Sequence, residues 1–334
     1  MRALFILTFV TGLGWAQAVP APAAAAGYNT LTWVTNPQPG DFDLAENYGR
    51  GFQMYAFNFF GATAPPPANL SFTANYLTVG ANNLAGTWSS IGKQTIRATP
   101  DYRGTCFGGG FYLEFTASWN HAQVLAANRS GGWPALWTET CEHLWQSSPP
   151  SDLWAGQGST YEHFIEADPM EDDLGAAYTG AYGAAVHEWW GAYRVTCPVP
   201  YCQTLNATVS GPPYNGGAFP SNYSNYVVSS PGLNFSSQHR YGMLWIAATP
   251  TTPGSITYYL DGNPTTSAVM WSQFTGQAPV ESGGVFSGPG TAPWTFGALD
   301  QLHLAVIIQT GNNQPMNIYL IRVWQASAAQ NLQN

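Results

Sequence analysis

The densest group of residues capable of chemistry lies at 161–171, where carboxylates fall within a short apolar run. The run reads Tyr-Glu-His-Phe-Ile-Glu166-Ala-Asp168-Pro169-Met-Glu171. Alternate residues of a strand share a face, so Glu166 and Asp168 point the same way, whereas Glu171 would face away. One β-bulge restores Glu171 to that face, and Pro169 lies where the bulge is needed, because a sheet tolerates proline at bulges. The spacing therefore predicts three carboxyl groups on one face of a bulged strand.

Such a row of carboxyl groups suits the retaining hydrolysis of a glycosidic bond. One carboxylate attacks the anomeric carbon while a second carboxyl group protonates the departing oxygen, and the two lie roughly 5–5.5 Å apart. A third acid between them keeps the two reacting groups in different charge states by holding a proton or a hydrogen bond. The alternative interpretation is an exposed strand that carries solvated acids.

The strand with the acids is one of many short β-rich segments, which are separated by Gly, Pro and Asn turns. Strands are predicted at 53–59, 70–79, 111–118, 164–171, 241–248, 256–260, 302–309 and 317–325. The Asp261-Gly262 pair favours a tight hairpin turn. A loop-rich insertion is expected at 197–232, and no repeat of solenoid or propeller period is found. This pattern indicates an all-β fold.

The composition indicates one large domain with a neutral ligand. Of the 334 residues, 15% are aromatic and only 8% are charged, and Lys93 is the sole lysine. The length alone does not demand two domains, because β-sandwiches of about 250 residues often form one unit. The net charge of −9 is scattered, without a basic stripe. Nucleic acid and anionic membrane surfaces are therefore poor partners, and we expect a monomer.

The N-terminus has the pattern of a secretory signal peptide at 1–18. Arg2 precedes an apolar run at 3–10, and Ala16-Gln17-Ala18 offers a small-residue cleavage site. The alternative, a membrane anchor, is disfavoured because the run is shorter than the roughly 20 residues that span a bilayer. We expect a secreted protein without a membrane partner after cleavage, a disordered lead-in at 19–26, a sandwich at 27–325 and a disordered tail at 326–334.

Cysteine usage agrees with export, since the chain has an even number, namely Cys106, Cys141, Cys197 and Cys202. Three pairings are possible and the sequence does not choose between them. The short Cys197–Cys202 spacing favours a local bridge, which leaves Cys106 for Cys141. The alternative, a zinc site, lacks the paired ligand spacing. Five N-x-[ST] sequons begin at Asn69, Asn128, Asn206, Asn222 and Asn234, and several are candidates for glycans if the source is eukaryotic.

Several further motifs appear in a fixed order around the acids. The segment Gly131-Gly-Trp133-Pro-Ala-Leu-Trp137 precedes them, and Val186-His187-Glu-Trp189-Trp follows. Later segments read His239-Arg-Tyr-Gly-Met-Leu-Trp, Tyr-Tyr-Leu-Asp261-Gly and Ile-Tyr-Leu-Ile-Arg322-Val-Trp. Together with Glu-x-Asp-x-x-Glu, this series resembles glycoside hydrolase family 16 of the laminarinase-like type, most clearly over 104–325.

The resemblance implies a concanavalin A-like β-sandwich, a jelly roll of two curved antiparallel sheets, with substrate lying across the concave sheet. It implies Glu166 as nucleophile, Asp168 as assisting acid and Glu171 as acid/base. Trp137 would offer a ring to a sugar face, although a core tryptophan is the alternative. His187 would hydrogen-bond the substrate or the nucleophile, and a histidine with a purely structural role is the alternative. Candidates for outer sugar contacts are Trp154, Trp189 and Trp190, whereas Trp133 is interpreted as packing.

The chain departs from the family pattern at Ile165 and Pro169, where the family has Gly and a branched aliphatic residue, and in the long 138–162 segment. The preferred function is a secreted retaining endo-glycosidase that cleaves a β-linked polysaccharide, best a β-1,3- or mixed-linkage β-glucan. The alternatives are a lectin-like binder, a transglycosylase and a wall-associated structural protein. No cofactor or catalytic metal is predicted, and the sequence does not decide whether a structural calcium is bound.

Overall fold

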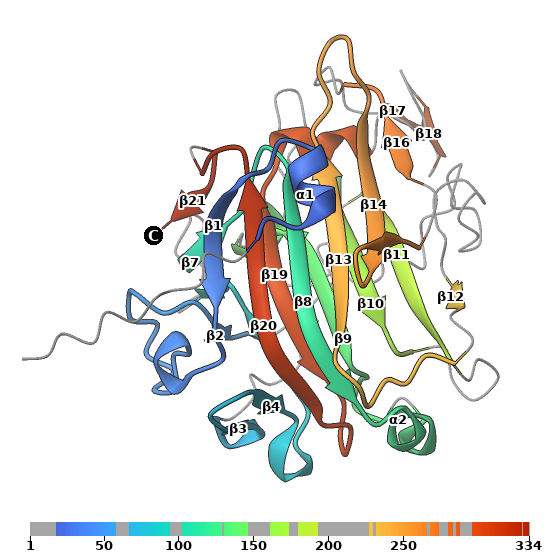
Figure 1. Cartoon of the computed structure of the whole chain (residues 1–334). Coiled ribbons are helices and arrows are strands. Elements are labelled where there is room, and N and C mark those ends of the chain that lie inside the picture. Colours follow the sequence, from blue (N-terminus) through green and yellow to red (C-terminus); the bar gives the residue numbers. More distant parts are fainter. Residues whose placement is uncertain are drawn as a thin grey trace, which may run out of the picture.

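The computed structural model describes residues 18–57, 67–93, 102–128, 130–145, 161–173, 180–192, 227–229, 232–265, 268–273, 280–282, 285–287, 296–328 and 330–333. Two antiparallel sheets stack face to face, and Figure 1 shows one sheet in front of the other. This arrangement confirms the predicted all-β sandwich. Within the described residues, no helix has both the length and the apolar composition needed to cross a bilayer.

The front sheet has nine strands in the order β15-β14-β13-β8-β20-β4-β3, with β1 on β20 and β16 on β14. Its strands are β1 (Thr30–Thr35), β3 (Leu70–Phe72), β4 (Leu77–Val79), β8 (Phe111–Trp119), β13 (His239–Ile246), β14 (Gly254–Leu260), β15 (Asn263–Pro264), β16 (Val269–Trp271) and β20 (Met316–Gln325).

The rear sheet has seven strands in the order β12-β11-β10-β9-β19-β5-β2. Its strands are β2 (Tyr55–Ala56), β5 (Gly86–Ser89), β9 (Ala135–Thr140), β10 (Tyr161–Glu171), β11 (Ala181–Ala192), β12 (Val227–Ser229) and β19 (Leu304–Thr310). The main core fills the space between the sheets, where Leu113 and Met243 of the front sheet join one cluster with Leu136, Ile165 and Val306 of the rear sheet. Burial of each such side chain contributes about 1.5–3 kcal/mol.

A small third sheet covers part of the other face of the rear sheet. It consists of β6 (Ile91–Lys93), β7 (Tyr102–Cys106) and β21 (Leu332–Gln333). Ile91, Tyr102 and Cys106 pack in a second apolar cluster with Trp137 and Ile307. The remaining elements are β17 (Val280–Ser282), β18 (Val285–Ser287), α1 (Ala21–Ala25), α2 (His121–Ala127), α3 (Cys141–Trp145), η1 (Pro39–Asp41), η2 (Pro67–Asn69), η3 (Ala81–Asn83) and η6 (Phe296–Gln301).

Most predicted strands are present with ends shifted by a few residues, but the strand expected at 70–79 is two strands. β3 and β4 pair antiparallel across a turn. The Thr73 hydroxyl accepts hydrogen bonds from the backbone N–H groups of Asn75 and Tyr76, which closes this turn. The hairpin predicted at Asp261-Gly262 is confirmed, since both residues have positive φ (53° and 84°), as the tightest hairpin turns require.

Both segments expected to be disordered are ordered. Residues 19–26 contain α1, whose fully buried Ala23 packs with Tyr112, Leu244 and Trp324 on the outer face of the front sheet. In the tail, Leu332 pairs with Cys106 through β21 and β7. Disorder was expected from the composition of the two segments. Composition does not show that a terminal segment can pack on an apolar surface or pair with a strand formed by distant parts of the chain.

The disulfide Cys106–Cys141 is present and joins β7 to α3. This confirms half of the preferred pairing, whereas Cys197 and Cys202 lie outside the described residues and their bridge stays a prediction. Of the five sequons, Asn128 and Asn234 are exposed. Asn69 is fully buried and accepts a hydrogen bond from Trp88 Nε1, so the folded chain leaves no room for a glycan there.

Asp300 in η6 is a partly buried acid that predicts a pH-dependent stability. Burial raises the pKa of its carboxyl group from 3.8 to about 6, although Trp271 Nε1 and the Ala248 backbone N–H donate to it at 2.9 and 3.1 Å. Between these two pKa values the unfolded chain is ionised while the folded chain holds a proton. Folding therefore becomes less favourable as pH rises through this interval, by up to about 3 kcal/mol.

We expect Asp300→Asn to reduce the fall in unfolding free energy between pH 4 and pH 7. The variant should be less stable overall, because the asparagine NH2 group would face an N–H group that donates to the carboxylate in the wild-type protein. The comparison is therefore the slope of stability against pH, measured by urea unfolding of both proteins across the interval. An identical slope in the variant would show that Asp300 does not carry this dependence.

Candidate functional site

Strand β10 carries the three predicted carboxylates on its outer face. Asp168 pairs with Ala185 of β11, but Glu171 pairs with Gly183, so β10 has one extra residue between them. The same shift appears against β9. Ile165, Ala167 and Met170 belong to the main core, which leaves the acids on the opposite face. The predicted β-bulge around Pro169 is confirmed.

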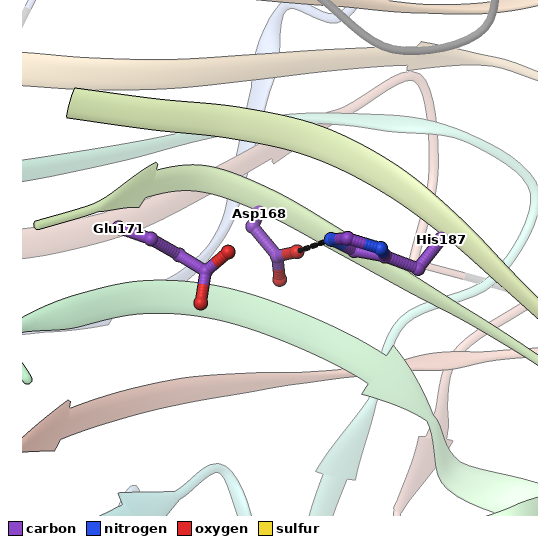
Figure 2. Close-up of side chains that lie close together, drawn as sticks. All are labelled: Asp168, Glu171 and His187. Atoms are coloured by element: carbon purple, nitrogen blue, oxygen red, sulfur yellow. Dashed lines mark ion pairs between the residues drawn. The ribbon is translucent and has the colours of Figure 1, made fainter. Parts of the chain in front are cut away.

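The acids form a compact group with a histidine of the neighbouring strand. His187 Nε2 lies 3.0 Å from Asp168 Oδ2, and Figure 2 shows Asp168 between His187 and Glu171. One ligand atom each of Asp168, Glu171 and His187 lie within 4.8 Å of one another. This is also a donor set whose spacing would suit a metal ion. The structure places His187 against the middle acid, whereas the resemblance implied a contact with substrate or nucleophile.

Trp133 contributes directly to this site, so its interpretation as packing alone is wrong. Its indole Nε1 donates a hydrogen bond to Glu171 Oε1 at 3.0 Å, while its ring packs partly against the second apolar cluster. The sequence signal was present in the motif that contains Trp133, but nothing in the motif says which way the ring nitrogen points. The bond holds the Glu171 carboxyl group at a defined position.

Glu139 is a fourth carboxylate on the same face, and it was missed by sequence analysis. It is the register partner of Glu166 on β9, and its side chain is fully buried in contact with His143 Nδ1 of α3. The alternation along β9 from Trp137 and the i,i+4 spacing to His143 were the available signals. Glu139, with His143 of α3 against it, therefore lies beside Glu166 on the β9 side.

Burial and mutual repulsion govern the protonation of the site. Burial, followed by the charge of Asp168, raises the pKa of Glu166 well above its ordinary value, and His187 opposes the shift. Burial also raises the pKa of Asp168 well above its ordinary value, reinforced by Glu171 and Glu139. Close carboxyl groups cannot all ionise together in such surroundings. The group therefore retains protons at a pH at which free carboxylates have lost them.

Trp137 does not offer an open ring to a ligand. It shares the outer face of the rear sheet, but it is only 3% exposed, because the second apolar cluster and the disulfide layer cover it. The expected sugar platform is therefore wrong, and the core alternative holds. Trp154 lies outside the described residues. Trp189 pairs with Phe164 in the β10–β11 ladder, and only its backbone is described.

The fold and the site define a β-sandwich with a row of carboxylates on one sheet, of which Asp168 and Glu139 are fully buried. No family model matches the chain, and no curated protein matches its sequence. A solved endo-1,3-beta-glucanase from Streptomyces sioyaensis is 17% identical, with 91% of this chain and 97% of that chain covered and a TM-score of 0.44.

Two further solved structures are carbohydrate-binding proteins by their descriptions. The exoplasmic/lumenal domain of VIP36, bound to Ca²⁺ and Man3GlcNAc, is 8% identical over 77% of this chain and 81% of that chain, with a TM-score of 0.33. The lectin UEA-II in complex with galactose is 8% identical over 88% and 99%, also with a TM-score of 0.33. We draw no functional conclusion from similarities of this size.

Proposed function

We propose that this chain is a secreted retaining glycosidase that cleaves β-linked polysaccharide internally, with a β-1,3- or mixed-linkage β-glucan as the best candidate. The observation that carries the proposal is the bulge in β10, which brings Glu171 onto the face of Glu166 and Asp168. Long side chains on one face of one strand can converge to the separation of roughly 5–5.5 Å that a retaining pair needs, which leaves no room for the water molecule of an inverting mechanism. The linkage preference depends on the family resemblance.

In this mechanism Glu166 attacks the anomeric carbon while Glu171 donates its proton to the departing glycosidic oxygen. A glycosyl ester on Glu166 results, and the aglycone leaves as an alcohol. Glu171, now ionised, takes a proton from water, which attacks the same carbon and frees Glu166. Asp168 lies between the two on the strand, and its Oδ2 is 3.0 Å from His187 Nε2. Coupling among the three carboxyl groups keeps the nucleophile and the acid in different protonation states.

A lectin-like binder is the competing hypothesis, and the free-energy cost of placing these carboxyl groups together argues against it. Buried carboxyl groups whose pKa values are raised together cost folding free energy at neutral pH, and a binding site for neutral sugars has no need of them. Groups of this kind are typical of catalytic sites.

The direct test incubates the purified protein with a panel of β-glucans and β-galactans. We expect products of mixed length from the first minutes of reaction, because internal cleavage does not start from chain ends. Proton NMR of the earliest product should show the β-anomer first, since retention preserves the configuration of the bond. An α-anomer first would exclude the mechanism, and saccharide binding without product would favour the lectin-like reading.

Asp168→Asn should move the acid limb of the kcat/KM profile to lower pH. The limb reports the ionisation of the nucleophile in the free enzyme, and Asp168 is the largest charge that raises the pKa of Glu166. Asparagine keeps the size of Asp168 and still accepts a hydrogen bond from His187. The measurement is kcat/KM against pH for both proteins, with Asp300→Asn as a variant whose limb should not move. A limb that stays in place or rises in Asp168→Asn would contradict the coupling.

A further inference from the structure

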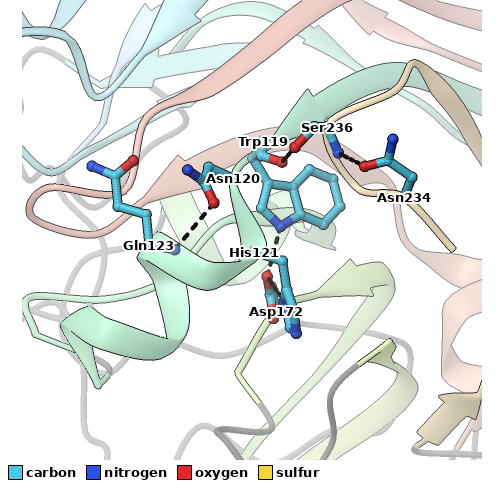
Figure 3. Close-up of polar contacts among 7 residues, drawn as sticks. All are labelled: Trp119, Asn120, His121, Gln123, Asp172, Asn234 and Ser236. Carbon is cyan, nitrogen blue, oxygen red and sulfur yellow. Dashed lines mark hydrogen bonds and ion pairs between the residues drawn. The ribbon is translucent and has the colours of Figure 1, made fainter. Parts of the chain in front are cut away.

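The carboxylate directly after Glu171 ties β10 to the front sheet. Asp172 is 2% exposed and points to the opposite face from Glu171, toward the end of β8 and the start of α2. Its Oδ2 accepts a hydrogen bond from Trp119 Nε1 at 2.6 Å and lies 2.8 Å from His121 Nδ1 (Figure 3). The Asp172 backbone N–H donates to the Pro134 carbonyl at 2.9 Å, which continues the β10–β9 ladder past Glu171.

The surroundings of Asp172 are aromatic, which makes its carboxylate costly to bury. The ring of Phe235 lies 5.0 Å from that of Trp119 and 4.6 Å from that of His121. Within the part of the chain that the structure describes, Asp172 Oδ1 and His121 Nε2 have no hydrogen-bond partner. An apolar residue of similar size would be cheaper here for packing alone. The position therefore calls for a reason other than stability.

The bulge supplies that reason. A β-bulge interrupts the ladder locally, and Pro169 within it has no N–H to donate. Pro169 has no register partner on either neighbouring strand, so the ladder is interrupted just before Glu171. Glu171 must nevertheless point along the row that Glu166, Asp168 and Glu171 form (the acid row). The contacts of Asp172 with Trp119 and His121 (the anchor) hold the chain just beyond the bulge, on the opposite face. They thereby fix the direction of the Glu171 side chain.

We propose that Asp172, held by Trp119 and His121, is a positioning residue that keeps Glu171 aligned for proton transfer. This inference rests on the proposed function. The separations of 2.6 and 2.8 Å between Asp172 Oδ2 and the two ring nitrogens are short, as strong hydrogen bonds are. The hydrogen bond from Trp133 to Glu171 reports the position of the Glu171 carboxyl group, because it forms only when that group is in place.

The test uses Asp172→Asn and Trp119→Phe, which weaken the anchor while keeping the aromatic packing. We expect kcat/KM for a β-glucan to fall on the order of 10–100-fold, as for a displaced catalytic group. An aryl glycoside with a good leaving group needs no proton for departure, and its rate should change less than about threefold. Asp300→Asn is the control, because Asp300 is also an acid outside the acid row that accepts a hydrogen bond from a tryptophan Nε1, that of Trp271. It should show no such difference between substrates.

A second measurement does not depend on activity. The indole N–H resonance of Trp133, assigned with Trp133→Phe, should move upfield in Asp172→Asn as its bond to Glu171 lengthens, and should stay in place in Asp300→Asn. A wild-type protein that cleaves no glycoside would refute the proposed function, and a moving resonance would still support the anchor. Equal losses on both substrates with an unmoved resonance would overturn the anchor and leave Asp172 with a role in stability only.

Discussion

Replacement of Glu166 with glutamine should abolish turnover while leaving oligosaccharide binding intact. Glutamine nearly preserves the shape of the side chain but cannot form the glycosyl ester, because the amide is not a nucleophile at the anomeric carbon. Loss of the covalent route should lower kcat on the order of 10⁴-fold or more. Binding of a β-glucan oligosaccharide, measured by calorimetry, should remain within about threefold of the wild-type affinity, since the sugar contacts are retained.

Glu142→Gln provides the matched control for this experiment. Glu142 lies on α3, with its Oε1 2.6 Å from His303 Nδ1, and it is not part of the acid row. It should retain turnover. A Glu166→Gln protein with unchanged turnover would refute the nucleophile, and the carbohydrate-binding reading of the sandwich would then stand in its place.

The acid row was the part of the site that the sequence predicted best, because its determinants are local. Alternation along a strand and the tolerance of proline at bulges place Glu166, Asp168 and Glu171 on one face from their spacing alone. The β10 register confirms this against both neighbouring strands. The strands themselves were predictable for the same reason, since turn residues and apolar runs act over short distances.

Features that depend on distant segments were not predictable in this way. Glu139 becomes a neighbour of Glu166 only through the β9–β10 pairing, and Asp172 meets Trp119 only because the two sheets face each other. Trp137 was expected to be open, but a separate small sheet and a disulfide cover it. In each case the residue type was visible in the sequence, while the partner lies in another part of the chain.

Replacement of Glu171 with alanine should separate substrates by their leaving groups. In natural glycans the leaving group is a sugar alcohol, which departs poorly and needs a proton from Glu171. Their hydrolysis should therefore slow on the order of 10³-fold. Aryl glycosides with acidic phenols depart without that proton, and the rate of their first step should fall less than about tenfold. Rapid-mixing measurement of phenol release isolates the first step for the aryl substrate.

The second step provides the decisive control, because Glu171 must also serve there as the base that activates water. In Glu171→Ala the glycosyl ester on Glu166 should therefore accumulate with the aryl substrate, and a burst of phenol should precede slow turnover. Azide needs no base, so adding it should restore turnover and yield a β-glycosyl azide, whereas it should not restore Glu166→Gln, which forms no ester. Equal losses on both substrate types, with no burst and no response to azide, would show that Glu171 is not the acid/base. Proton transfer would then have to be sought among the other carboxyl groups of the row, beginning with Asp168, which lies between Glu171 and His187.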